Sequence, residues 1–153
     1  MIPDTIMSIL QEHGLEPLVF EPGSTPTVAD AARMIGVQEG QIAKSILMRG
    51  KDGIFRMFVI AGDKKISSGK LKKLTGVKQS MASADDTLAA TGFSPGGVCP
   101  FGTEGIEIFI DDSLADYDVV YPAAGDDASG VPVTWKQLLE ITGGSRCDII
   151  TGS

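Results

Sequence analysis

The chain contains few of the residues on which disulfide and metal chemistry depend. Its 153 residues include two cysteines, Cys99 and Cys147, and one histidine, His13. Two cysteines are too few for a disulfide framework, so we expect free thiols in a reducing compartment. A single imidazole excludes every motif that needs two, including zinc-protease patterns, and no other residue pattern requires a metal or a cofactor.

Long apolar segments are also absent. No stretch approaches the roughly 20 apolar residues of a membrane helix, and the first residues lack the basic start and apolar middle of a signal peptide. With 42% hydrophobic and 22% charged residues, the composition indicates one compact globular domain over residues 1–153. We therefore expect a cytoplasmic protein with no membrane partner.

The net charge of -7 conceals an uneven distribution. Residues 1–78 carry a charge of +3 and residues 79–153 carry -10. Six lysines lie within residues 64–78, a segment without an acidic residue. This segment can attract phosphates even on an acidic protein, or it can be an ordinary solvated helix face.

Helical and extended patterns alternate along the chain. An apolar pattern predicts a first helix that closes near Gly14, and capping-box pairs predict three more that begin at Thr27, Ser83 and Thr134. Strand-like runs cover residues 17–21, 42–48, 55–61, 106–110, 117–121 and 131–133. Because several runs follow one another without a helix between them, we expect a mixed α/β domain with a mixed or largely antiparallel sheet.

Residues 87–103 contain no charged residue, and the second half of this segment is rich in glycine and proline. Such a composition favours a loop over a helix or a strand. Glycines let a backbone approach a ligand and present successive N–H groups, as oxyanion and phosphate sites require. An ordinary buried turn explains the same composition.

Lys44 lies in an apolar strand-like run, on the same face as Ile42, Ile46 and Met48 by strand alternation. A lysine in this position either extends its ammonium to the edge of the sheet or meets an anion, because an isolated buried ammonium is too costly. Both interpretations remain open from the sequence.

Two further motifs carry little weight. Cys99 could act as a nucleophile only beside a base, and His13 is the only imidazole, so a structural thiol is the simpler interpretation. The segment GDKKISSGK is not a phosphate-binding P-loop, because six residues separate its glycines and Leu71 follows Lys70 where Ser or Thr is needed.

Taken in order, these segments resemble the YbaK and prolyl-tRNA-synthetase-associated domain family of aminoacyl-tRNA deacylases, which work in trans or as inserted editing domains. The resemblance rests on TVADAARMIGVQEGQIAKSILM, FVIAGDKKISSGKLKKLTG, ASADDTLAATGFSPGGVCPFG and IFIDDSLADYDVVYPAAG. It implies a single α/β domain with a mixed, largely antiparallel, barrel-like sheet surrounded by helices.

The resemblance also implies residue roles in hydrolysing the ester of a mischarged aminoacyl-tRNA. Lys44 would hold the terminal adenosine or phosphate, while the loop from Gly96 to Pro100 would shape the aminoacyl pocket, with the N–H groups of Gly97 and Val98 stabilising the oxyanion. The remaining pocket residues would be Ile46, Met48, Phe93, Cys99 and Gly125, although Phe93, Ile46 and Met48 fit an ordinary apolar core equally well. The residues expected to bind tRNA are Lys64, Lys65, Lys70, Lys72 and Lys73.

Two features depart from the family pattern. Cys99 stands where many members carry serine, which argues against an essential nucleophile. Asp126 and Asp127 follow Gly125 where basic residues are frequent, and they would either recognise an amino group or be solvated turn carboxylates. The alternative function is a non-catalytic module that binds the tRNA acceptor end or a nucleotide. An aminoacyl-tRNA synthetase is a further candidate partner under either function, and we expect no DNA partner.

Overall fold

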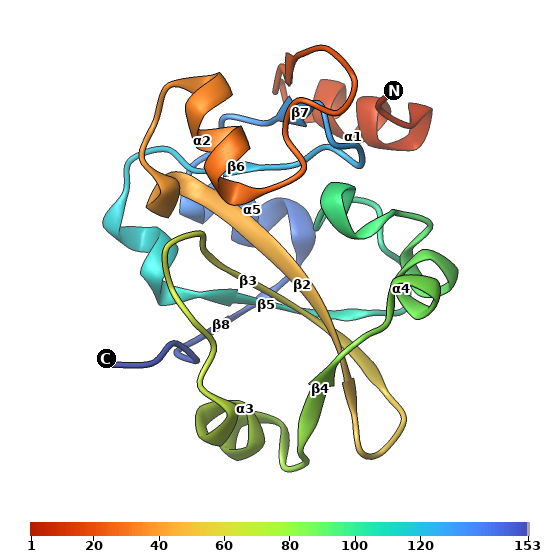
Figure 1. The fold of residues 1–153 in the computed structure, drawn as a ribbon, viewed down its shortest axis with the longest axis vertical. Helices are drawn as coiled ribbons and strands as arrows, with labels where there is room; N and C mark the ends of the chain where they lie inside the picture. The colour runs from red at the N-terminus through yellow and green to blue at the C-terminus, as the bar shows by residue number, and fades with distance from the viewer. Residues whose placement is uncertain (153) are drawn as a thin grey trace.

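Short helices surround one mixed β-sheet in the computed structural model, which describes residues 1–152 (Figure 1). The α-helices are α1 (Asp4–Glu12), α2 (Val28–Ile35), α3 (Ser68–Thr75), α4 (Ala84–Thr91) and α5 (Trp135–Thr142). The strands are β1 (Leu18–Val19), β2 (Ile42–Gly50), β3 (Phe55–Ala61), β4 (Gln79–Met81), β5 (Glu107–Asp111), β6 (Tyr121–Pro122), β7 (Ser129–Gly130) and β8 (Ser145–Cys147). Three short 3-10 helices complete the fold: η1 (Glu39–Gln41), η2 (Pro95–Gly97) and η3 (Asp112–Asp116).

The helix starts expected from the capping pairs are confirmed. Thr27 Oγ1 accepts the Asp30 N–H at 3.1 Å, and the hydroxyls of Ser83 and Thr134 accept the corresponding N–H groups of α4 and α5. Gly36 ends α2 at φ +82°, a left-handed conformation that a glycine adopts without a Cβ penalty. These local signals set the bounds of α2, which is followed by η1 and then by β2.

The sheet has the strand order β4-β2-β3-β5-β8, and β6 also pairs with β2. β2 runs antiparallel to β3 and β4, whereas the β2–β6, β3–β5 and β5–β8 pairs are parallel. The mixed α/β architecture is confirmed. Three of these five strand pairs are parallel, so the sheet is not largely antiparallel, and it does not close into a barrel. The β3–β5 pair is parallel because residues 62–106 return the chain to the end of the sheet where β3 starts.

Three of the expected strands are shorter than the sequence indicates, and of residues 17–21 only Leu18–Val19 form a strand, β1. Residues 117–121 and 131–133 meet only through a bridge in which Val120 and Val133 exchange two hydrogen bonds. Pro122 and Pro132 flank this bridge and cannot donate to a longer ladder. β4 and β8, which the sequence did not indicate, each have three residues.

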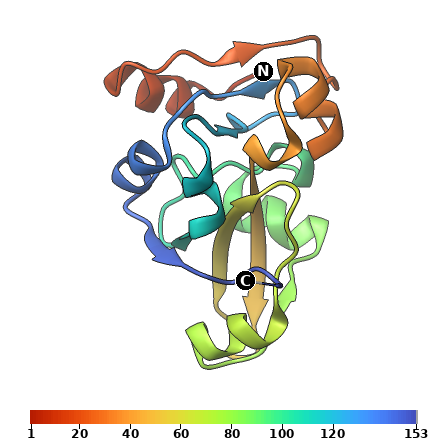
Figure 2. The ribbon, with the colours of Figure 1, turned by 90° about the vertical axis from the view of Figure 1, so that its left-hand side faces the viewer.

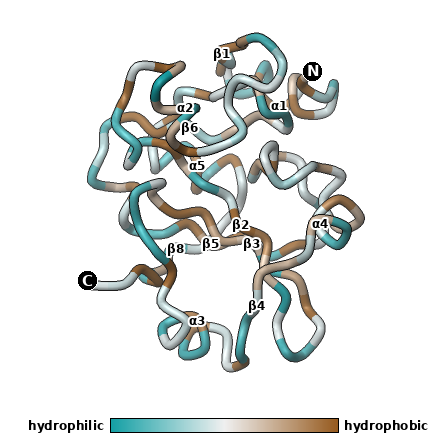
Figure 3. The backbone as a smooth tube through the Cα atoms, in the orientation of Figure 1, coloured by the Kyte–Doolittle hydropathy of each residue, from teal (hydrophilic) through white to brown (hydrophobic). Residues whose placement is uncertain are grey.

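The sheet separates apolar clusters on its two faces. Leu47, Val59 and Ile110 belong to the larger cluster, which also includes residues of α1 and α5, whereas Met48, Phe58 and Ile60 pack with Leu71 of α3. The central strands are correspondingly hydrophobic in Figure 3. α1 and α2 lie at one end of the molecule and α3 at the other (Figures 1 and 2). Over residues 1–152, every helix is too short or too polar to cross a membrane.

Candidate active site

A cavity of about 400 Å³ lies where α2, the start of β2 and the glycine loop meet. We define the glycine loop as residues 92–102, which include η2. β2 contributes Lys44 and Ser45 to the cavity wall, and the glycine loop contributes Gly96 and Val98. The structure therefore brings the predicted lysine and the predicted loop to one cavity.

Lys44 is accessible because β2 has a gap along one edge. β6 pairs with Ile42 and Ala43, and β4 pairs with β2 only from Met48 onward, so neither strand covers Lys44. The residue is exposed, and within residues 1–152 its ammonium forms no ion pair. The side chain reaches solvent at the sheet edge, as one of the two interpretations expected, and it remains available to an anionic ligand.

The glycine loop is held close to the segment that follows Gly125. A Cβ atom on Gly97 would lie 2.8 Å from the Cα atom of Asp126, which is closer than real Cβ contacts. The Gly97 N–H donates to the Ser94 carbonyl at 2.8 Å. Gly97 is therefore a packing glycine with an occupied N–H, which corrects its expected role as an oxyanion donor. Val98 is the remaining candidate.

Four other residues expected at the aminoacyl pocket do not line the cavity. Phe93, Cys99 and Pro100 are buried, and a Cβ on Gly125 would lie 2.9 Å from the Phe93 ring. Phe93 and Cys99 belong to the larger apolar cluster, so the glycine loop turns these two side chains toward the core. Contact of the four residues with the amino acid stays a prediction, which the lining of the cavity does not support.

Cys99 is unsuited to nucleophilic attack. Its side chain is 0% exposed, and its thiol lies 3.5 Å from the Phe101 carbonyl oxygen. Burial raises the pKa of the Cys99 thiol to about 12, so the thiol is protonated at neutral pH. His13 caps the end of α1 and does not line the cavity. The structure thus agrees with a structural thiol.

Ile46 and Met48 lie elsewhere than expected. They line a groove of about 320 Å³ that shares Lys44 with the cavity and has Lys64 and Lys65 on its wall. The predicted tRNA-binding lysines divide into three groups: Lys64 and Lys65 at the groove, the exposed pair Lys72 and Lys73 on α3, and Lys70, which hydrogen-bonds to Asp148 and the Ile150 carbonyl.

Asp126 and Asp127 brace the loop that faces the glycine loop. Asp126 accepts hydrogen bonds from the Ser129 hydroxyl at 2.6 Å and the Ala128 N–H at 3.1 Å. Asp127 accepts the Gly23 N–H at 3.1 Å. Both carboxylates are therefore hydrogen-bonded within the protein and only partly buried.

The cavity also contains hydroxyl groups that sequence reasoning missed. Thr25 Oγ1 accepts the N–H of Ser129 at 3.3 Å, and both residues line the cavity. Ser45 Oγ is buried and has no hydrogen-bond partner within residues 1–152. The pairing of β1 with β7 brings Thr25 close to Ser129 from a separation of 104 residues, and no local pattern indicates this.

Comparison with known proteins identifies the family. Residues 22–141 match the model of the aminoacyl-tRNA editing domain, and the chain belongs to this family. The protein YwhH of Bacillus subtilis, which has no assigned function, is 40% identical over 120 residues that make up 78% of this chain and 76% of YwhH. A proline–tRNA ligase of Kosmotoga olearia is 37% identical over 67% of this chain, but the match spans only 17% of the ligase.

Two further relatives carry names that state an activity. The "Putative Cys-tRNA(Pro)/Cys-tRNA(Cys) deacylase EbsC" of Enterococcus faecalis is 25% identical over 78% of this chain and 74% of its own length. A crystal structure described as "a putative trans-editing enzyme for prolyl tRNA synthetase" superposes with a TM-score of 0.87 at 29% identity, covering 99% of this chain and 100% of that one. The expected resemblance to the YbaK family is confirmed.

Proposed function

We propose that the protein hydrolyses the ester bond of a mischarged aminoacyl-tRNA. The observation that carries the proposal is the meeting of Lys44 with Gly96 and Val98 at one cavity, in a chain of the editing-domain family. Lys44 supplies a positive charge for the phosphate or ribose of the acceptor end. The glycine loop supplies a rigid wall against which the ester lies.

An aminoacyl ester is already activated, so its hydrolysis needs orientation and oxyanion stabilisation more than a strong nucleophile. One well-placed N–H donor contributes roughly a hundredfold or more to the rate, and fixed geometry adds to it. In our proposal the Val98 N–H is that donor. Water attacks the carbonyl carbon, and the free ribose hydroxyl of the terminal nucleotide assists the proton transfer.

The cavity wall suggests how the amino acid is selected. Ala29, Ala31, Ile35 and Ile42 contribute apolar surface to the cavity from α2 and β2. Because one methylene is worth only about 1 to 3 kcal/mol of binding, steric exclusion of larger side chains supplies much of the discrimination. The substrate in this proposal carries a small amino acid.

The test is deacylation of a panel of mischarged tRNAs by the purified protein, with the Lys44→Ala variant as control. We expect ester cleavage for one or a few small amino acids and almost none for the variant. If the wild-type protein retains tRNA in a salt-dependent manner but cleaves no ester, the protein is a binding module and the proposal is wrong.

A further inference from the structure

Three lysines converge at the end of the molecule opposite α1 and α2 (Figure 1). Lys51 lies in the turn between β2 and β3, Lys72 on α3, and Lys78 directly before β4. All three line one concavity, which is separate from the cavity that contains Lys44. The three side chains are exposed, and within residues 1–152 none of them forms an ion pair. We call Lys51, Lys72 and Lys78 the cationic patch.

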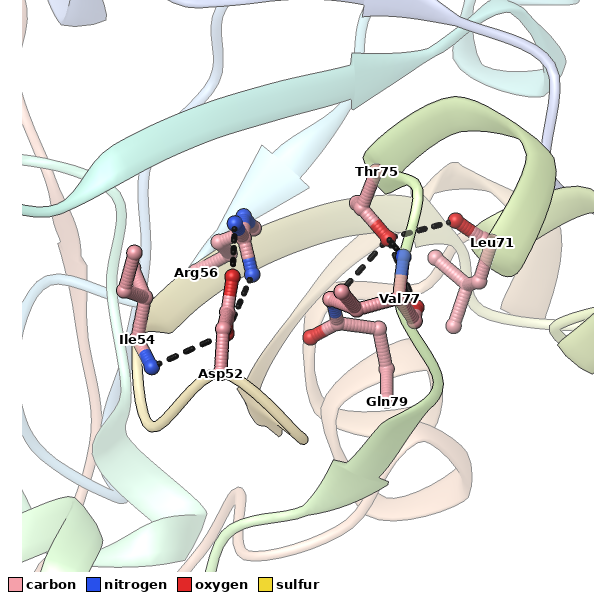
Figure 4. Close-up of polar contacts among 7 residues, drawn as sticks. All are labelled: Asp52, Ile54, Arg56, Leu71, Thr75, Val77 and Gln79. Atoms are coloured by element: carbon pink, nitrogen blue, oxygen red, sulfur yellow. Dashed lines mark hydrogen bonds and ion pairs between the residues drawn. The ribbon is translucent and has the colours of Figure 1, made fainter.

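The acidic side chains near the patch are already paired. Asp52, which lines the same concavity, accepts hydrogen bonds from Arg56 Nη2 at 2.9 Å and from the Ile54 N–H at 3.1 Å (Figure 4). The hydrogen bond from the Arg56 guanidinium holds the pKa of Asp52 below its usual value. Asp86, in the neighbouring concavity, pairs with Arg49 at 3.9 Å. Each acid thus balances an arginine, and the patch keeps the positive charge of its three lysines.

The backbone segments that carry the patch are bonded to one another. The Lys51 N–H donates to the Lys78 carbonyl at 2.8 Å, which joins the β2–β3 turn to the segment before β4. Gln79 Nε2 donates to the Thr75 hydroxyl at 3.0 Å, which joins β4 to the end of α3 (Figure 4). A Cβ on Gly50 would lie 3.1 Å from the same Gln79 nitrogen, so these segments are also closely packed. The three lysines therefore extend from a fixed framework.

A series of adjoining concavities connects the cavity to the patch. The cavity shares Lys44 with the groove, and the groove shares Met81 with a third concavity beside β4. This third concavity shares Lys51 and Lys78 with the concavity of the patch. A long ligand anchored in the cavity can therefore follow the surface to the patch.

The strand β2 gives the length of this path. Lys51 follows Lys44 by seven residues of extended chain, which at about 3.3 Å per residue span roughly 23 Å. A stacked nucleic-acid strand advances about 3.4 Å per nucleotide, so the patch lies about seven nucleotides from a terminal nucleotide held at Lys44. This is farther than the unpaired end of a tRNA reaches. The part of the substrate that meets the patch is the base-paired acceptor stem.

We infer that the cationic patch binds phosphates of base-paired RNA, namely of the stem that adjoins the acceptor end. The inference rests on the proposed function, because the ester in the cavity sets the position of the stem. Double-helical RNA is bound mainly through its shape, its phosphates and its ribose hydroxyls, and lysines contact phosphates without reading the sequence. The patch therefore raises the affinity for tRNA and does not touch the reacting ester. Lys72 is among the lysines expected to bind tRNA, whereas Lys51 and Lys78 are additional.

The experiment compares the binding of two RNA ligands to the intact protein. One is a minihelix that has a base-paired stem and an unpaired 3′ end, and the other is an unpaired oligonucleotide with the same 3′ sequence. Affinity is measured between about 50 and 200 mM salt, because each phosphate contact adds roughly 0.9 to the steepness of log K against log salt concentration for a duplex. We expect Lys51→Gln to reduce this steepness by about 1 for the minihelix, and the double variant with Lys78→Gln to reduce it by about 2. Neither variant should change the binding of the oligonucleotide.

Lys136→Gln is the matched control, because it removes another exposed lysine, on α5, that lines none of these concavities. We expect it to preserve the wild-type salt dependence. An unchanged salt dependence in the double variant would overturn the inference and leave the patch to an acidic protein partner. An equal loss in Lys136→Gln, or an equal loss for the oligonucleotide, would overturn it as well. If the double variant shows the expected change but the wild-type protein cleaves no ester, only the proposed function is wrong.

Discussion

The close approach of Gly97 to Asp126 makes a quantitative prediction. A methyl group at Gly97 would lie 2.8 Å from Asp126 Cα and 3.0 Å from the neighbouring backbone C and N atoms. These are backbone atoms, so a side-chain rotation cannot relieve the overlap. One of the two loops must move by about half an ångström, and overpacking of this kind costs about 1 to 3 kcal/mol.

The adjacent glycine is a matched control for stability. A Cβ on Gly96 would meet its nearest atom, the Pro26 carbonyl oxygen, at 3.4 Å, and neither Gly96 nor Gly97 has a positive φ. We expect Gly97→Ala to lower the melting temperature by roughly 2 to 10 °C, and Gly96→Ala to change it by about 1 °C or less.

Thermal unfolding followed by circular dichroism measures both variants. Equal melting temperatures for wild type and Gly97→Ala would refute the packing argument, and so would an equal loss in both variants. Because Gly97 fixes the position of the glycine loop, Gly97→Ala should also slow ester hydrolysis at temperatures where the variant is fully folded.

Other predictions concern the buried hydroxyl and thiol groups. Ser45→Ala removes a buried hydroxyl that has no internal partner, so the variant should unfold at the same temperature as the wild-type protein or at a higher one. If the Ser45 hydroxyl contacts the substrate, the variant should also show a several-fold lower kcat/KM. An unchanged kcat/KM would show that the hydroxyl does not contact the substrate. Cys99→Ser should retain most activity, and complete loss would instead support covalent catalysis. Burial raises the pKa of Cys99 and Cys147 from 9.0 to about 12, so native protein at pH 8 should resist alkylation at both thiols, as mass spectrometry can measure. Because the pKa of both thiols is raised in the folded protein, the thiols of the unfolded chain lose their protons at a lower pH. The free energy of unfolding should therefore fall as the pH rises from about 9 toward 12. In Cys99→Ala this fall should be less steep, because only Cys147 contributes to it.

The local features of the fold were predictable from the sequence because short-range chemistry determines them. Thr27, Ser83 and Thr134 cap their helices with side chains that reach only three residues along the chain. The apolar runs of β2 and β3 likewise predicted two largely buried strands. The parallel pairing of β3 with β5 was not predictable in this way, because it depends on where residues 62–106 return the chain.

The candidate site was predictable only in part for the same reason. Lys44 and Gly96 are marked by an unusual lysine in an apolar strand and by a glycine-rich loop, and the structure brings both to one cavity. Ile46 and Met48 share a strand face with Lys44, but they line the groove instead, because the strand carries them past the cavity. The hydroxyls of Thr25 and Ser129 meet through strand pairing over a long sequence separation, which leaves no local signal.

The central claim is that the Lys44 ammonium holds the acceptor end beside the glycine loop. Its most direct test is the single-turnover rate of ester hydrolysis for Lys44→Ala on the preferred mischarged tRNA, compared with Lys136→Ala, which removes an exposed lysine of α5 that does not line the cavity. We predict near-complete loss of hydrolysis for Lys44→Ala at an unchanged melting temperature, with wild-type rates for Lys136→Ala. Wild-type rates for Lys44→Ala would contradict the account.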